Sequence, residues 1–293
     1  MALLLIILAA FLGGGTGVLI KIALAEIPPL SFTFIRFLTA SLFIIPLFLK
    51  EKKKKIAKKD IFELALVSLL AVSNVTFFAY GVRFTSATVA QTLYTTVPIV
   101  AAFLSYLILK EKITVNKIFG VLLGLLGTII IIVVPALGKK LSLQGSLGGN
   151  LLIIVALVSF SFYSIFSKKL QKKYSPIYLT TAFVITTTVV QLFLSASDIS
   201  LHPGWWQKVT LGAILATLYV AIVATVIYYI LYQYAIKHGG PIIASLTLYL
   251  QPVATYLWAA VLLKERLTLP LILGAILIFF SAWLVTSKYG NWE

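Results

Sequence analysis

A few polar side chains recur at helical spacing inside long apolar stretches of the sequence. Gln91 and Tyr94 stand three residues apart in one stretch, and Ser245 and Tyr249 stand four apart in another. Residues at these spacings share one face of a helix. Because an unsatisfied polar group costs several kcal/mol in hydrocarbon, such a face should turn away from lipid. The pattern is typical of solute binding by neutral hydrogen-bonding groups.

We therefore expect a binding site for a small-molecule substrate, built from amide, hydroxyl and phenol groups. The predicted lining residues are Thr16, Asn74, Gln91, Tyr94, Tyr163, Tyr228, Tyr232, Ser245 and Tyr249. In the alternative interpretation, tyrosines such as Tyr94 and Tyr249 form an aromatic belt at the membrane surface, and Gln91 and Ser245 only bond neighbouring helices.

Two prolines fall near the middle of apolar stretches. Pro98 and Pro252 each remove a backbone hydrogen bond there and are expected to kink their helices. They are predicted to act as hinges, with a fixed kink that shapes the cavity as the alternative.

Two basic residues, Lys21 and Arg36, lie within apolar stretches, near their predicted outer ends. Both side chains are long enough to snorkel to the membrane surface. The sharper hypothesis is a basic outer vestibule that attracts carboxylate or phosphate groups.

The same stretches lack the groups that catalysis or metal binding needs. All eight acidic residues fall in loops or near predicted helix ends, the chain has no cysteine, and its two histidines, His202 and His238, are far apart. We therefore expect no enzyme activity, no metal site and no cofactor. The absence of a central carboxylate also argues against proton-coupled export of cationic drugs.

The composition places these residues in a membrane. Hydrophobic residues make up 61% of the 293-residue chain and charged residues 11%, and the mean hydropathy is +1.07. Soluble domains carry roughly 25% charged residues. The net charge of +16 comes from lysines in the loops between apolar stretches, so we expect the lipid bilayer as partner and no nucleic acid.

The sequence predicts an all-α polytopic membrane protein with ten transmembrane helices. The predicted spans are residues 2–25, 30–49, 61–82, 85–108, 113–134, 149–167, 177–196, 209–235, 241–262 and 268–286. Seven lysines lie between residues 50 and 59, which places that loop in the cytoplasm. Both termini are then cytoplasmic, in a multi-pass protein of the cell (inner) membrane.

The sequence contains an internal repeat. Glu111 and Gly120 follow Pro98 by 13 and 22 residues, and the same two intervals recur from Pro252, at an offset of 154. Upstream, Pro29 and Pro176 correspond at an offset of 147.

The repeat predicts two similar halves, residues 1–138 and 139–293, with five spans each. Because five is odd, the second half must enter the membrane from the opposite side. Such inverted repeats are typical of transporters, although duplication can also persist for stability alone.

These residues resemble the drug/metabolite transporter superfamily, in particular ten-helix members with two EamA domains. The resemblance rests on Pro29-x6-Arg36-Phe37-x2-Ala40, and on Pro98 leading to Lys110-Glu111-Lys112-Ile113-Thr114 and Gly120, repeated from Pro252 to Gly274. It implies a central cavity between the halves, lined by spans one, three, four, six, eight and nine, and export or exchange of metabolites such as amino acids. The chain departs from the family pattern in having Leu12 before the first-span glycine and Lys110 and Lys264 before the motif glutamates.

The sequence thus predicts an alternating-access exporter or facilitator of amino acids or related metabolites. The alternatives are a carrier of phosphorylated or sugar-nucleotide solutes, which would need more basic residues in the cavity, and a membrane scaffold or receptor that transports nothing. Small-residue faces such as Gly120 and Gly124 fit packing within one chain as well as dimerisation, so the oligomeric state stays open.

Overall fold

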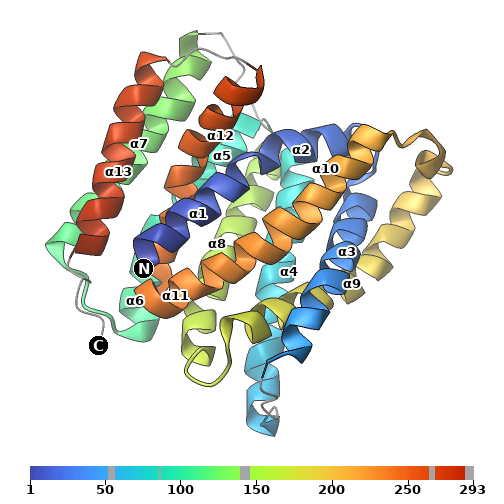
Figure 1. Cartoon of the computed structure of the whole chain (residues 1–293), viewed down its shortest axis with the longest axis horizontal. Helices are drawn as coiled ribbons and strands as arrows, with labels where there is room; N and C mark the ends of the chain where they lie inside the picture. Colours follow the sequence, from blue (N-terminus) through green and yellow to red (C-terminus); the bar gives the residue numbers. More distant parts are fainter. Residues whose placement is uncertain (52–56, 86, 139–145, 264–267, 288–293) are drawn as a thin grey trace.

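The regular structure is helical throughout the part of the chain that the computed structural model describes, residues 1–51, 57–85, 87–138, 146–263 and 268–287. In chain order the elements are α1 (Ala2–Gly14), α2 (Thr16–Leu24), α3 (Pro29–Leu49), η1 (Lys58–Asp60), α4 (Ile61–Phe84), α5 (Ala87–Tyr94), α6 (Val97–Leu109), α7 (Val115–Gly138), α8 (Leu147–Leu170), α9 (Pro176–Leu201), η2 (Trp205–Lys208), α10 (Leu211–Ala221), the π-helical turn η3 (Ile222–Ile227), α11 (Tyr228–Ser245), α12 (Thr247–Leu263) and α13 (Leu269–Thr286) (Figure 1).

Eight helical stretches within the described residues are long and apolar enough to cross a membrane. This confirms the predicted polytopic all-α fold. The other two predicted spans are shorter as helices: the first is divided into α1 and α2, and the ninth consists mainly of the 17-residue α12. The first, fourth and ninth spans are thus interrupted helices.

Each interruption is stabilised by side chains that bond the freed backbone. At the break after α1, the Gly14 carbonyl accepts a hydrogen bond from Thr255 at 2.7 Å. At the break between α5 and α6, Thr95 and Thr96 donate back to carbonyls of their own turn. Ser245 and Thr247 do the same on either side of Leu246. Non-helical backbone at membrane depth is tolerated where such bonds replace the helical ones.

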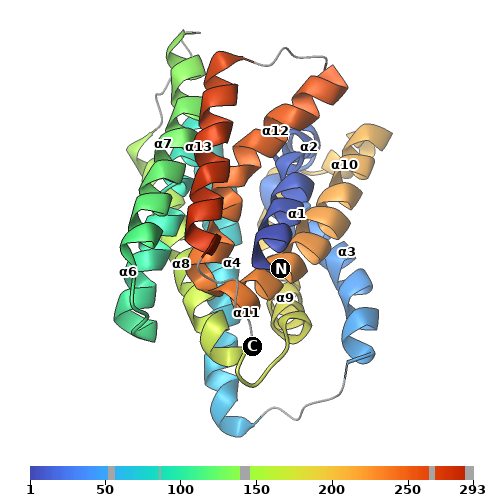
Figure 2. The same cartoon turned by 60° about the vertical axis from the view of Figure 1, so that its left-hand side comes forward.

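The contacts between the two halves are symmetric: each main helix–helix contact has an equivalent in which the two halves have traded places. Helix α3 contacts its counterpart α9, and α7 contacts its counterpart α13. The remaining main contacts come in matched pairs: α8 of the second half packs on α4 and α6 of the first, and α1 of the first packs on α11 and α12 of the second. Figure 1 shows α7 and α13 together at one edge and α3 and α9 together at the other, and Figure 2 again shows α7 beside α13.

The paired counterparts run antiparallel. A Cβ atom on Gly120 would lie 2.3 Å from Val285, and one on Gly274, a full repeat later, would lie 2.4 Å from Ile131. Early residues of α7 therefore meet late residues of α13, and the reverse holds at the other end. This is the arrangement that a twofold axis in the membrane plane produces. The predicted boundary between residues 138 and 139 falls at the edge of the described chain.

Charged residues tie the helix ends at both faces of the bundle. Lys173, in the loop before α9, forms a salt bridge to Asp60, the N-cap residue of α4. This hydrogen bond raises the pKa of Lys173 above its ordinary value. At the other face Glu26 accepts hydrogen bonds from the backbone and hydroxyl of Thr210, the N-cap of α10. Glu26 and Lys173 lie 147 residues apart, so they occupy equivalent loops.

Candidate functional site: a central cavity

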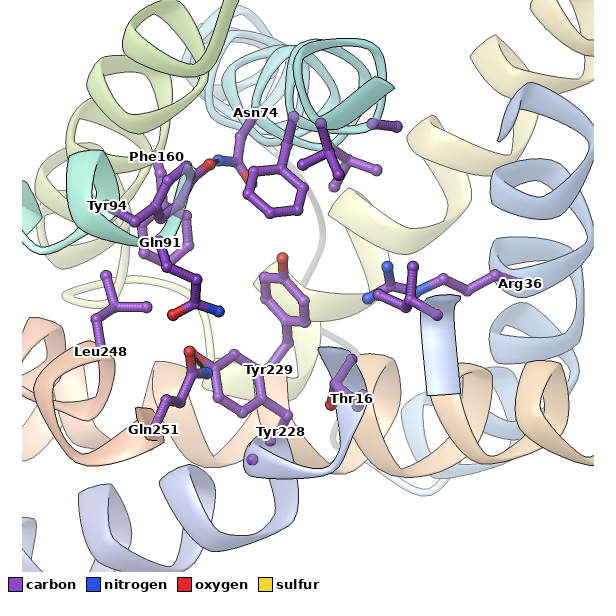
Figure 3. A pocket seen from close by; sticks show the side chains of 18 of the residues that line it. Thr16, Arg36, Asn74, Gln91, Tyr94, Phe160, Tyr228, Tyr229, Leu248 and Gln251 are labelled. Atoms are coloured by element: carbon purple, nitrogen blue, oxygen red, sulfur yellow. Dashed lines mark hydrogen bonds between the residues drawn. The ribbon is translucent and has the colours of Figure 1, made fainter. Parts of the chain in front are cut away.

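A cavity of about 400 Å³ lies at the centre of the bundle between the two halves (Figure 3). Its wall is made by the α1–α2 break, by α3, α4 and α5 of the first half, and by α8, η3, α11 and α12 of the second. The lining residues are Gly13, Gly14, Thr16, Ile20, Leu24, Phe32, Thr33, Arg36, Asn74, Val75, Phe78, Ala79, Val82, Gln91, Tyr94, Thr95, Phe160, Ala224, Tyr228, Tyr229, Leu248, Gln251 and Thr255. The volume suits a small organic molecule.

Five of the predicted lining residues lie in this wall, namely Thr16, Asn74, Gln91, Tyr94 and Tyr228. Asn74 joins the halves, because its amide nitrogen donates to the phenol of Tyr94 and, at 3.0 Å, to the carbonyl of Ala156 in α8. The hydroxyl oxygen of Thr16 is buried with no hydrogen-bond partner among the described residues. The cavity wall thus carries fixed polar groups and at least one unused polar group.

Two further predicted residues, Tyr163 and Tyr232, do not line the cavity. Both side chains are fully buried in the packing between α8 and α11. Tyr163 accepts a hydrogen bond from the Gln233 amide, and Tyr232 shares one of 2.9 Å with Ser164. They belong to the closed end of the bundle described below.

The last two, Ser245 and Tyr249, are also buried away from the cavity. Ser245 lies in the short turn that follows Gly240, whose positive φ of 82° divides α11 where the chain reverses. The second interruption at Leu246 rotates α12 relative to this turn. Leu248 and Gln251 therefore face the cavity, while Tyr249 packs against Gly124 of α7. Uniform helical spacing through Leu246 gives the wrong face.

Sequence spacing missed other wall residues as well. Tyr229 follows Tyr228 directly, yet both line the cavity. The π-turn η3 ends just before them and shifts the helical phase there. Gln251 donates to the phenol of Tyr228 at 3.3 Å, and Figure 3 shows its amide facing that of Gln91. A glutamine beside a proline in an apolar stretch was the available signal.

The cation Arg36 lies in the cavity wall. Its Nε donates a hydrogen bond of 2.6 Å to the hydroxyl of Thr225 in η3. The side chain of its predicted vestibule partner, Lys21, lies outside the described residues. The predicted hinges, Pro98 and Pro252, are both buried and line no part of the cavity. Pro98 stands in the first turn of α6, where a proline starts a helix without kinking it, and Pro252 lies inside α12.

One end of the cavity leads toward the surface of the bundle. A second hollow, of about 450 Å³, shares Leu24, Ala79 and Val82 with the cavity wall. It continues along the loop between α2 and α3 to His202 and Trp205. The cavity therefore opens toward the face that carries these loops.

The opposite end is closed by a network of buried polar residues between α8 and α11. The amide nitrogen of Gln233 donates to the hydroxyls of Tyr163 and Ser167, and Gln171 donates to the side chain and backbone of Gln233. Next to them Lys168 donates to the carbonyls of Ile236 and Lys237. We call Tyr163, Ser167, Gln171 and Gln233 the closed-end network.

The side chains of the cavity wall are suited to binding a solute through hydrogen bonds and ring contacts. Asp, Glu, His and Cys are absent from the lining residues, and the described chain contains no group of three such side chains that could hold a metal ion. What the wall offers is one guanidinium group, several amides and hydroxyls, and aromatic rings.

Comparison with known families gives two matches along the chain. The profile of the EamA-like transporter family matches residues 1–133 and, a second time, residues 147–287. The two matched segments correspond to the two halves found by the internal repeat.

Similar chains are found in bacteria and archaea. The uncharacterized transporter YoaV of Bacillus subtilis is 28% identical over 290 residues, covering 98% of this chain and 97% of its own. An uncharacterized transporter of Archaeoglobus fulgidus is 28% identical and covers 97% of both chains. Among solved structures, one crystal structure superposes with a TM-score of 0.79 at 18% sequence identity, over 98% of this chain and 96% of that one, which shows the fold.

Proposed function

The chain belongs to the EamA-like transporter family, and on this premise we propose that it carries small metabolites across the membrane by alternating access around the central cavity. In this mechanism one binding site is exposed first to one side of the membrane and then to the other. An inverted repeat allows this exchange because each half can adopt the conformation of its counterpart.

The observation that carries the proposal is a correspondence between the closed end and the open end. Offsets of 147 for the first and sixth spans and 154 for the third and eighth relate Ser167 to Ile20 and Gln233 to Ala79. Ser167 and Gln233 are hydrogen-bonded at 3.0 Å in the closed-end network, whereas Ile20 and Ala79 both line the open cavity. The same holds for Tyr163, whose equivalent is Thr16.

Exchanging the conformations of the halves would therefore close the present opening with the residues that now line it. α2 would pack on the end of α4 as α8 now packs on α11, and the closed-end network would separate. The contacts that would form are apolar, between side chains such as Ile20, Leu24 and Val82. The contacts that would break are the hydrogen bonds of the closed-end network. Hydrogen bonds therefore stabilise the present conformation, and apolar contacts would stabilise the exchanged one.

For the substrate we propose amino acids or related small metabolites. The cavity volume of about 400 Å³ and its mixed polar and aromatic wall support this class. A phosphorylated or sugar-nucleotide solute is the less favoured alternative, because Arg36 is the only cation among the lining residues that the structure describes. A scaffold needs no cavity that reaches the surface, and a receptor would bind the solute without carrying it across the membrane.

We further propose that the cavity opens to the outside and that both termini are cytoplasmic, in a cell membrane. The support is the charge of the two faces. Lys168, Lys169, Lys172 and Lys173 lie at the closed end, as do Lys50 and Lys58, while Glu26 lies at the open end. Cytoplasmic loops are enriched in Lys and Arg.

The test is flux into proteoliposomes. Purified protein would be reconstituted and offered labelled amino acids, neutral metabolites and phosphorylated compounds, with and without a pH gradient. Uptake of one class above that of empty liposomes is expected, and uptake without the gradient would identify a facilitative carrier.

A Ser167→Cys/Gln233→Cys double variant supplies a matched control. Because the chain has no cysteine, an oxidative cross-link would join only these two positions and hold the closed end shut. Net flux should stop on cross-linking and return on reduction. Absence of flux for every class in the wild-type protein would contradict the proposal, as would flux that the cross-link leaves unchanged.

A further inference from the structure

Among the residues that the structure describes, Arg36 is the single charged one that lines the cavity. It is the eighth residue of α3, about 10 Å along the helix axis from its start. A positive charge near the bilayer centre costs about 2.5–3.5 kcal/mol on the translocon scale, and intramembrane cations therefore mark functional sites by default. Transport alone does not explain the charge of Arg36, because a cavity that binds neutral solutes needs no charged residue.

The guanidinium group is fixed in a defined orientation. Its Nε donates to Thr225, and the Thr225 hydroxyl donates in turn to the carbonyl of Val220 at 2.9 Å. Thr225 lies in the π-turn η3, where the carbonyl five residues back comes within reach. The π-turn thus holds Thr225, and Thr225 holds Arg36.

This bond leaves the two terminal nitrogens of Arg36 without a hydrogen-bond partner in the described part of the chain. Figure 3 shows them directed into the cavity, toward the phenol of Tyr229. Two parallel N–H donors on a planar group match the two oxygens of a carboxylate. The donors face open space and not a protein acid.

Packing does not explain the charge either. The equivalent position in the second half, 147 residues later, is Phe183, whose ring is fully buried against Phe37, Tyr163 and Tyr229. The same place in the same fold therefore accepts an apolar ring. Only the first half carries a cation there, and only in the first half does that side chain face the cavity.

We propose that Arg36 binds the carboxylate of the transported molecule, and that the substrate is a small monocarboxylate, zwitterionic or singly negative. This inference rests on the proposed function. The described lining residues include no acid to neutralise a net positive substrate and no second cation for a doubly negative one, and an unpaired charge is strongly unfavourable in such a site. The ammonium group of a zwitterion finds aromatic rings and amide oxygens opposite Arg36, on Tyr228, Tyr229 and Gln251.

The test compares each labelled amino acid with its carboxamide, which differs only in lacking the negative charge. In wild-type proteoliposomes we expect the carboxylate to be preferred by roughly 10- to 100-fold, the range of a charge-assisted hydrogen bond. Arg36→Gln should abolish this preference, and Arg36→Lys should retain part of it. Thr225→Val, which leaves the charge in place and removes its support, should reduce it.

Lys172→Gln, in an exposed loop at the closed end, is the matched control and should keep the wild-type preference. Ligand-induced rises in melting temperature give a second readout that needs no transport, because they report binding alone. The outcomes are distinguishable. If wild-type protein moves no compound, the proposed function fails; if it moves carboxylates and carboxamides equally, or only phosphorylated compounds, transport stands and the role of Arg36 is refuted.

Discussion

The hydroxyl oxygens of Ser41 and Thr188 lie 2.9 Å apart, and the two residues occupy the same position in the two halves, because they are 147 residues apart. Equivalent residues of two halves can meet only on the twofold axis that relates them. The contacts on either side agree: the backbone of Ser31 binds Asp198 at one end of the α3–α9 pair, and Ser175 binds Glu51 at the other. The axis therefore passes between α3 and α9 at this hydrogen bond.

A disulfide on the axis should leave transport intact. When the two halves exchange conformations, Ser41 takes the place of Thr188 and Thr188 that of Ser41. The distance between the two residues is therefore the same in the outward-open and inward-open states. Ser41→Cys/Thr188→Cys protein is therefore expected to cross-link fully and to retain most of its flux, as measured in the same proteoliposomes before and after reduction. A cross-link here that stops transport would show that α3 and α9 separate during the cycle.

A pair at the open end should behave in the opposite way. Ile20→Cys/Ala79→Cys is the symmetry counterpart of the hydrogen-bonded Ser167 and Gln233 pair. We expect it to cross-link slowly in the resting protein and faster when substrate drives the cycle, with loss of flux on cross-linking. Mass spectrometry of the linked peptides follows the reaction, and a failure to link during turnover would speak against closure of this end.

The close contact of α7 with α13 predicts a large effect of one methyl group. Gly274→Ala would place a Cβ atom 2.4 Å from Ile131 and 2.6 Å from the Gly127 carbonyl. Overpacking of this kind typically costs about 1–3 kcal/mol, so the melting temperature in detergent should fall. Gly148→Ala is the control, because a Cβ atom there meets nothing within 4 Å; equal melting temperatures for the two variants would refute the predicted packing.

The proposed orientation has its own test in intact cells. Gln207→Cys places a thiol in the exposed loop at the open end, and Lys172→Cys places one at the closed end. A membrane-impermeant maleimide should label position 207 directly and position 172 only after permeabilisation. The reverse labelling would invert the orientation and make the described cavity open to the cytoplasm.

The sequence predicted the architecture well, because hydrophobic length and repeat spacing are properties of the chain itself. The apolar stretches became helices, and the offsets of 147 and 154 relate residues such as Ser41 and Thr188 that the fold brings together. In the first half, Thr16, Asn74, Gln91 and Tyr94 lie in the cavity wall. The helix α5 is unbroken from Ala87 to Tyr94, so the helical spacing of Gln91 and Tyr94 holds there.

In the second half, helical spacing alone was insufficient. The interruption at Leu246 and the π-turn η3 each change the phase of a helix, so Gln251 and Tyr229 face the cavity in place of Tyr249 and Tyr232. Neither break has a proline at its centre. Both breaks depend on contacts with other helices, such as the hydrogen bond between Thr225 and Arg36. A pattern that repeats every 3.6 residues along one helix does not predict such tertiary contacts.

The lone charge of the cavity has an electrical consequence. In alternating access the voltage across the membrane falls over whichever end is closed, at present the network around Gln233. When the closed end changes sides, Arg36 passes from the electrical potential of one side of the membrane to that of the other, although the side chain itself moves little. The energy of its positive charge changes by about 2.3 kcal/mol per 100 mV of membrane voltage. A bound, singly negative monocarboxylate would cancel that charge. An inside-negative voltage should then favour the inward-open form of the empty protein, while the orientation of the protein loaded with a singly negative substrate stays insensitive to it.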